Sequence, residues 1–187
     1  LLSKSDLKGP TNRSYQISSG TFGASFNLCS SERFREQRNP AFCSGSLIGP
    51  DTVLTAGHCI ANEKACSDVR FVFGFGIRKQ NVLPYEISEG EIYKCAYIIH
   101  SQTGPGGSDF ALIQLDRPVA NHLPLSIRQS GKVATGEPLI VIGHPSGLPT
   151  KVAGGGQVRD NSPTSYFVTN LDTYGGNSGS SVFNANT

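Results

Sequence analysis

Short apolar runs, separated by glycine and proline, recur along the whole chain and restrict the folds open to it. The runs are rich in Val, Ile, Phe and Tyr, and they span residues 42–49, 52–56, 69–75, 91–100, 110–115, 138–143, 165–171 and 180–184. Runs of this length and composition, bounded by turn residues, predict β-strands. No window keeps a 3.6-residue period, so only a short turn at 56–60 is expected to be helical. The sequence therefore predicts an all-β sandwich or barrel.

The 187-residue length allows one domain or two small ones, with ample chain to bury a core. A polar, proline-bearing stretch at 115–132 is the expected crossing between two β-units. We therefore expect an N-terminal unit over 1–120 and a C-terminal unit over 121–187. The second unit would hold fewer strands than the first, because the sequence stops at Thr187 just as a strand would be turning.

Composition and charge exclude several classes of protein. Hydrophobic residues make up 37% of the chain and charged residues 16%, which fits neither a disordered nor a membrane protein. The net charge of +2 is too small to indicate a nucleic-acid partner. The one basic cluster, at 31–38, interleaves Arg with Glu, as is typical of a solvated loop. The opening "LLSKSDLKGP" is no signal peptide, so we expect a processed chain.

The cysteines indicate an oxidising compartment. The five lie at positions 29, 43, 59, 66 and 95. None form a C-x-x-C motif or pair with histidines at zinc-finger spacing, so we expect a secreted or periplasmic protein with disulfides. Because five is an odd number, one thiol is free or has its partner outside this sequence.

The sequence indicates no cofactor and no metal ion. The "FGFG" at 73–76 begins like a dinucleotide-binding loop but lacks its third glycine, since Lys79 stands there. His100, His122 and His144 show no metal-ligand spacing and are expected to be structural.

Three short motifs carry residues of the kinds needed for nucleophilic catalysis. His58 lies in "LTAGHC", Asp109 in "GGSDFALIQL" and Ser178 in "GGNSGS". Taken singly, each has an ordinary reading, as a satisfied polar residue, a turn former before a strand, or part of a glycine-rich turn. Together they supply a nucleophile, a general base and a carboxylate to orient the base.

The order of these motifs and the residues around them resemble the chymotrypsin/trypsin-like serine proteases. The residues after Ser178 look closest to bacterial members, including the glutamyl endopeptidase branch. The resemblance covers residues 20–187 and implies two six-stranded antiparallel Greek-key β-barrels, the second incomplete in this sequence. Two further strands, on the order of 20 to 40 residues, are expected after Thr187.

The resemblance implies a secreted serine endopeptidase and gives each motif residue a role. Ser178 would attack the peptide carbonyl, His58 would take its proton, and Asp109 would hold the imidazole in the required tautomer. The backbone N–H groups of Gly176 and Ser178 would form the oxyanion hole. This role explains the glycines, because they let the backbone turn its donors toward the substrate.

The resemblance also implies a disulfide pairing. Cys43 and Cys59 are expected to form the bond that holds the His58 turn, and Cys66 would then pair with Cys95 across neighbouring strands. Cys29 is left over. Its partner lies beyond Thr187, or it is a free buried thiol.

The resemblance further suggests a substrate preference. In this family the residue six positions before the nucleophile lies at the base of the pocket for the side chain that precedes the cut. Here that residue is Asp172, with Thr173 beside it. A carboxylate there pairs with Arg or Lys and repels Glu, so cleavage after Arg or Lys is expected. The alternative is that Asp172 caps a turn and faces away.

The chain also departs from the family's animal members. Asn177 stands where they carry the Asp that pairs with a new N-terminal amine, and the opening "LLSK" also differs, so their activation switch is expected to be absent. The expected partners are protein or peptide substrates, with no nucleic acid or membrane. A separate C-terminal fragment would complete the second barrel, and the protein is otherwise expected to be a monomer. Two alternative functions stay open, a glutamyl-specific endopeptidase of the same fold and a catalytically inactive protease-like binding protein.

Overall fold

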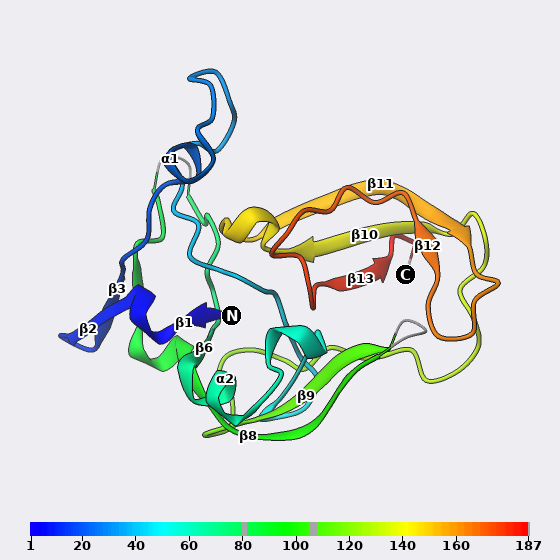
Figure 1. The fold of residues 1–187 in the computed structure, drawn as a ribbon, viewed down its shortest axis with the longest axis horizontal. Helices are drawn as coiled ribbons and strands as arrows, with labels where there is room; N and C mark the ends of the chain where they lie inside the picture. Colours follow the sequence, from blue (N-terminus) through cyan, green and yellow to red (C-terminus); the bar gives the residue numbers. More distant parts are fainter. Residues whose placement is uncertain (80–81, 105–107, 187) are drawn as a thin grey trace.

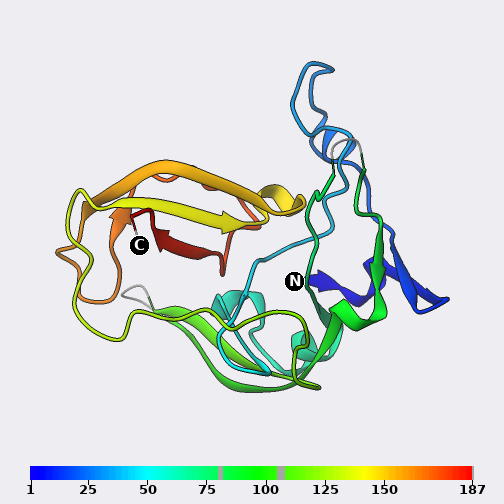
Figure 2. The same ribbon diagram turned by 180° about the vertical axis from the view of Figure 1, so that it is seen from behind.

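The chain forms two curled antiparallel sheets that face each other, with a smaller sheet beside the first (Figures 1 and 2). This computed structural model describes residues 1–79, 82–104 and 108–186. The strands are β1 (Leu2–Ser3), β2 (Leu7–Thr11), β3 (Ser14–Ile17), β4 (Ser46–Leu47), β5 (Thr52–Thr55), β6 (Val69–Val72), β7 (Glu86–Ser88), β8 (Ile92–Thr103), β9 (Asp109–Leu115), β10 (Pro138–Gly143), β11 (Lys151–Asp160), β12 (Val168–Thr169) and β13 (Ser181–Asn184). The helical segments are η1 (Lys4–Asp6), α1 (Phe22–Phe26), η2 (Gly57–Cys59), α2 (Glu63–Asp68), η3 (Glu89–Glu91) and η4 (Pro145–Gly147).

The first sheet has the strand order β1-β6-β8-β9-β5-β4 and carries the largest core. Its centre is the long pair β8 and β9, whose register places Thr103 opposite Asp109. Along β9, Ala111, Ile113 and Leu115 are buried and alternate with half-buried residues. This alternation is expected for a strand with one face on a core. Asp109 shares the face of these buried residues but is itself exposed, at the start of the strand.

The three-stranded sheet, with the order β2-β3-β7, packs its own small core beside the first sheet. The segment that follows β3 includes α1 and projects from the rest of the molecule (Figure 1). Both short α-helices begin with a side-chain cap, Thr21 for α1 and Asn62 for α2, which accepts a hydrogen bond from the backbone of the first turn. Among the described residues, no helix is long and apolar enough to cross a membrane.

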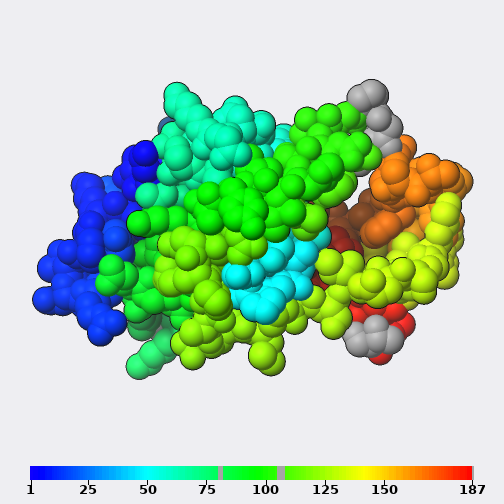
Figure 3. All heavy atoms as spheres, turned by 90° about the horizontal axis from the view of Figure 1, so that it is seen from below, coloured from blue at the N-terminus to red at the C-terminus, as the bar shows by residue number. Residues whose placement is uncertain are grey.

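The second sheet has the order β12-β11-β10-β13 and a separate core of Leu139, Val141, Val158 and Leu171. The stretch from 116 to 137 connects β9 to β10 and forms no strand. A largely apolar cavity of about 580 Å³ lies between the two sheets, lined in part by Leu54, Ile127 and Phe183. Figure 3 shows a hollow between the two halves of the molecule, with red C-terminal residues at its base. The second sheet thus leaves an open, apolar inner face.

The structure corrects several sequence-based strand boundaries. Strands were expected over 42–49 and 165–171, but only Ser46–Leu47 and Val168–Thr169 pair within those stretches. The bounds of β10 agree with the prediction, whereas β11 was not predicted at all. Two short helices were likewise missed, since only η2 lies where a helical turn was expected.

Candidate active site

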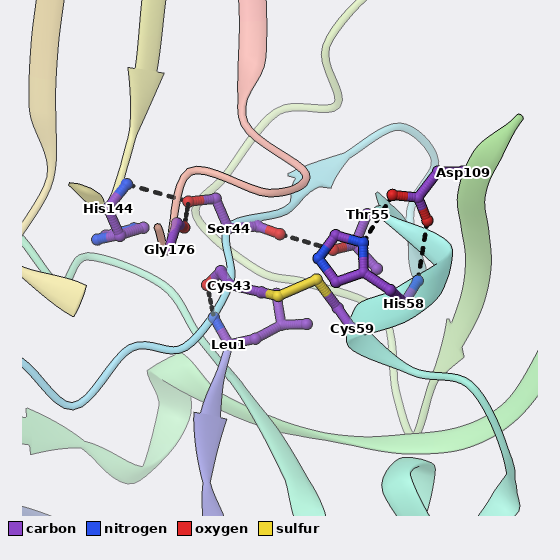
Figure 4. The surroundings of a disulfide bond; sticks show 9 residues. All are labelled: Leu1, Cys43, Ser44, Thr55, His58, Cys59, Asp109, His144 and Gly176. Carbon is purple, nitrogen blue, oxygen red and sulfur yellow. Dashed lines mark hydrogen bonds and ion pairs between the residues drawn. A yellow bond between two sulfur atoms is a disulfide. The ribbon is translucent and has the colours of Figure 1, made fainter. Parts of the chain in front are cut away.

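His58 and Asp109 form a directly hydrogen-bonded pair on the first sheet. His58 lies in η2, which follows β5, and Asp109 opens the neighbouring strand β9. The His58 Nδ1 atom lies 2.6 Å from Asp109 Oδ2, and the His58 backbone N–H donates to Asp109 Oδ1 at 2.9 Å. Figure 4 shows both contacts. The two bonds fix the imidazole and the carboxylate relative to each other, so the ring is oriented before any ligand binds.

The surroundings of Asp109 favour its ionised form. Its partial burial alone would raise the pKa, but the hydrogen bonds from the His58 backbone and ring outweigh this effect. The net result is a pKa below the usual range of an aspartic acid. A charged carboxylate at Nδ1 accepts a hydrogen bond from the Nδ1–H group and leaves Nε2 as the basic nitrogen.

The turn that carries His58 requires glycine at position 57. A Cβ atom there would lie 2.3 Å from the Gln102 carbonyl oxygen and 2.9 Å from Thr103 Cγ2. Since real Cβ atoms do not approach so closely, η2 lies directly on the backbone of β8 only because Gly57 has no side chain. The Cys43–Cys59 disulfide ties the other end of η2 to the segment before β4.

Ser178 lies in a tight turn between β12 and β13. The turn contains Gly176 and Gly179 with φ values of 91° and 83°, in the region that favours glycine. A Cβ on Gly179 would lie 2.5 Å from Thr55 Oγ1 and 3.0 Å from the Ala56 nitrogen. The turn therefore packs against the end of β5, next to the start of η2.

The structure brings the Ser178 turn to the His58 loop without a hydrogen bond between the two side chains. Among the hydrogen bonds of the described residues, none joins Ser178 Oγ to His58. The backbone N–H groups of Gly176 and Ser178 also donate no hydrogen bond within the described part of the chain. These two N–H groups are therefore free to donate hydrogen bonds to an anionic oxygen.

Asp172 and Thr173, the expected pocket residues, are both exposed. Within the described ranges, Asp172 forms no ion pair or hydrogen bond with a protein group. They lie in the segment between β12 and the Ser178 turn.

Both expected disulfides form in the structure. Cys43 bonds to Cys59, and Cys66 bonds to Cys95 between α2 and β8. Cys29 is free and exposed, so the expectation that an unpaired Cys29 would be buried is wrong. It lies two residues beyond Asn27, the C-terminal cap of α1.

The remaining histidines make structural contacts. His122 Nε2 lies 2.6 Å from Glu91 Oε2, and the His122 ring stacks on Phe73. His144 Nδ1 donates to the Leu148 carbonyl at 2.9 Å. Cys43, Cys59 and His58 have potential ligand atoms close together, but both sulfurs are in a disulfide and offer no thiolate to a metal ion.

Ser44 and Thr55, which were not predicted from the sequence as site residues, connect the two halves of the site. Both are buried, and the Thr55 hydroxyl donates to the Ser44 carbonyl at 2.6 Å. The Ser44 N–H donates to the Ser178 carbonyl at 2.8 Å. Their place beside the Cys43 and His58 motifs was the only signal in the sequence, and it does not reveal hydrogen bonds to distant residues.

Comparisons with known proteins identify the family. The trypsin-like peptidase domain matches residues 43–187. The chain therefore belongs to the trypsin-like peptidase family. It is 32% identical to a glutamyl endopeptidase of Bacillus licheniformis over 151 residues, covering 75% of this chain and 45% of that protein. It is 29% identical to human chymotrypsin-like elastase family member 3B over 123 residues, covering 65% of this chain and 42% of that protein. The chain thus spans less than half the length of these relatives.

Solved structures confirm the fold. A Glu endopeptidase has a TM-score of 0.56 at 24% identity, covering 77% of this chain and 69% of the other. A serine endoprotease from Yersinia pestis has a TM-score of 0.55 at 17% identity, covering 84% and 47%. The two facing half-barrel sheets are those of a chymotrypsin-like fold, as the three motifs implied, with the second barrel incomplete in this chain.

Proposed function

We propose that the protein is a serine endopeptidase that hydrolyses peptide bonds through a Ser178–His58–Asp109 triad. The observation that carries this proposal is the hydrogen-bonded His58–Asp109 pair, with the Ser178 turn packed beside the loop that bears His58. A merely structural histidine has no need to contact one carboxylate through both its ring and its backbone N–H at the exposed end of a central strand. Family membership supports the same conclusion.

The geometry suggests how each group acts. Asp109 accepts a hydrogen bond from the Nδ1–H of His58, which keeps its proton, so Nε2 is left to take the proton of the Ser178 hydroxyl as Oγ bonds to the peptide carbonyl carbon. The carbonyl oxygen becomes negative and accepts hydrogen bonds from the free N–H groups of Gly176 and Ser178. His58 then gives its proton to the leaving amine, and a water molecule hydrolyses the acyl-enzyme by the same steps.

For the residue that precedes the cut, we propose Arg or Lys. Asp172 carries a negative charge that has no partner within the described residues, so it can pair with a substrate cation. Thr173 beside it would line the same pocket.

A second candidate is cleavage after Glu. The observation that favours it is the likeness to the glutamyl endopeptidase of Bacillus licheniformis, at 32% identity over 75% of this chain. Under this candidate, Asp172 would face away from the pocket, and other groups would bind the substrate carboxylate.

We also propose a secreted or periplasmic location, which the two disulfides and the likeness to the Bacillus licheniformis protein support. The substrates would be proteins or peptides, and the protein would act as a monomer. Because the inner face of the second sheet is open and apolar, we propose that a further polypeptide segment covers the cavity beside β13.

Cleavage of a mixed peptide library, read by mass spectrometry, tests the activity and the preference together. The full-length protein is compared with Ser178→Ala and Asp172→Asn. We expect cuts after Arg and Lys that vanish in Ser178→Ala and weaken strongly in Asp172→Asn. Cuts after Glu, unaffected by Asp172→Asn, would keep the triad and replace the Arg/Lys preference by the second candidate. Cuts that persist in Ser178→Ala would refute the triad.

A further inference from the structure

The structure points to a positioning role for the Ser44 hydroxyl, and we propose that it holds the oxyanion turn in its active orientation. The inference rests on the proposed serine endopeptidase function. Ser44 is only 2% exposed, although it is a polar residue. Its hydroxyl donates to the Gly176 carbonyl at 2.8 Å and accepts a hydrogen bond from the His144 N–H at 3.0 Å (Figure 4).

Ser44 contacts both halves of the candidate site. Its backbone N–H donates to the Ser178 carbonyl at 2.8 Å, and its carbonyl accepts from the Thr55 hydroxyl at 2.6 Å. Thr55 is the last residue of β5, shortly before His58. Ser44 thus links the turn of the nucleophile to the strand that leads to the base.

The Ser44 hydroxyl holds the turn at Gly176, the residue whose backbone rotates most easily. Gly176 has a φ of 91° and no side chain, so its flanking peptide groups rotate easily. The peptide before Gly176 is held through its carbonyl, since the Ser146 N–H donates to Gly175 O at 2.5 Å. The peptide after Gly176 is held through its own carbonyl by Ser44 Oγ. With both carbonyls held, the Gly176 N–H keeps one direction.

Burial strengthens the hydrogen bonds that the Ser44 hydroxyl makes. A hydrogen bond in a site screened from water is electrostatically stronger than one at the surface. The Ser44 side chain also makes two bonds at once, to Gly176 and to His144 at the end of β10, so its rotamer is fixed. An oxyanion hole accelerates the reaction only when its donors are already aligned, because reorganising them would take up part of the gain.

The test compares Ser44→Ala with Ser46→Ala in the full-length protein. Ser46 is a matched control, because its hydroxyl also joins the two sheets, by contacting the Ser181 hydroxyl, but does not contact the oxyanion turn. Rates are expressed per active site, titrated to completion with an organophosphonate, and melting temperatures are measured for each variant.

We expect Ser44→Ala to lower kcat by on the order of 10- to 100-fold, less than the loss of a whole oxyanion donor. KM should change by less than about 2-fold, because the oxyanion forms only in the transition state. The affinity for a peptide aldehyde, whose adduct places an oxygen in the hole, should fall by the same factor as kcat. Ser44→Thr, which keeps the hydroxyl, should recover most of kcat, and Ser46→Ala should resemble the parent.

Several results would overturn the proposal. An unchanged kcat in Ser44→Ala would do so, as would a rise in KM alone or an equal loss in Ser46→Ala. If Ser44→Ala does not fold, Ser44→Gly removes the same hydroxyl and must show the same kcat loss. If neither variant folds, the hydroxyl is a requirement of the fold and the positioning role is wrong. A parent protein that neither reacts with the organophosphonate nor cleaves peptides would instead refute the proposed function itself.

Discussion

At the scale of single residues, the contact between Asp109 and His58 determines which imidazole nitrogen is basic. The carboxylate binds Nδ1 and the backbone N–H of His58 at the same time. An amide at position 109 would keep a similar shape but could present a donor to Nδ1 and so favour the wrong tautomer.

We therefore expect Asp109→Asn to lower kcat by about 10⁴-fold with little change in stability. Steady-state kinetics and thermal unfolding check both parts. Asp116→Asn is the control, because Asp116 also contacts a neighbouring backbone N–H but lies away from His58. A loss of less than about tenfold in Asp109→Asn would show that Asp109 does not orient the base.

The titration of a single residue, His144, makes the stability of the fold depend on pH. Burial of the ring, together with the nearby positive charge of Lys151, lowers its pKa from 6.5 to about 4. Because the folded pKa lies below the unfolded value, the contribution to stability is complete above pH 6.5 and is lost as the pH falls toward 4.

We expect the free energy of unfolding to drop by about 2 to 3 kcal/mol between pH 7 and pH 4.5 from this residue alone. Urea unfolding at several pH values measures it. The variant His144→Asn should have a correspondingly flatter profile, since its amide can donate to Leu148 but does not titrate. Equal slopes in the two proteins would contradict the assignment.

Single residues also show how much of the candidate site could be predicted from the sequence. His58, Asp109 and Ser178 could be selected because each lies in a distinctive short motif. Ser44 could not, because its partners His144 and Gly176 lie 100 and 132 positions away. Only the folded chain brings them together.

At the scale of elements, glycines decide where the turns of the site can lie. Gly57 lets η2 rest on β8, since a Cβ there would lie 2.3 Å from a backbone oxygen of Gln102. Gly90, in η3, is also a glycine within a short helical turn, but a Cβ there would meet only Ser88 Oγ at 3.7 Å.

We expect Gly57→Ala to destabilise the protein by about 3 kcal/mol, because the backbone of η2 or β8 must move to make room for the added methyl group. The same movement would displace His58 and so reduce kcat. Gly90→Ala should change stability by less than about 1 kcal/mol and leave kcat unchanged. Denaturant unfolding and kinetics on both variants check this. A Gly57→Ala protein with the parent's stability would show that η2 does not lie as close to β8 as described.

The sequences of two neighbouring strands also show why β10 was predicted and β11 was not. β10 is a continuous apolar run, which indicates a buried strand. β11 contains Gly154, Gly155 and Gly156, and a run of glycines in a sequence is typical of a loop. In the sheet these glycines have a use, because Gly155 has a φ of 79° at a register shift and Gly156 lies under Leu171. Tertiary packing thus overrides the local preference.

At the scale of the whole molecule, the site exists only because two sheets meet. His58 and Asp109 come from the first sheet, and Ser178, the proposed nucleophile, comes from the turn before β13 in the second. The sequence predicted no three-stranded sheet, which the structure forms from β2, β3 and β7. Those strands are short and polar, and they show little of the alternation that identifies a strand.

The most direct test of the serine endopeptidase proposal is covalent labelling of the full-length protein with an organophosphonate, followed by peptide mapping. We expect one label per molecule, on Ser178, with labelling abolished in Ser178→Ala and strongly slowed in His58→Ala. Ser180→Ala, which removes a neighbouring hydroxyl of the same turn, should label like the parent. An unlabelled parent protein, or a label on another residue, would contradict the triad and favour a protease-like binding protein.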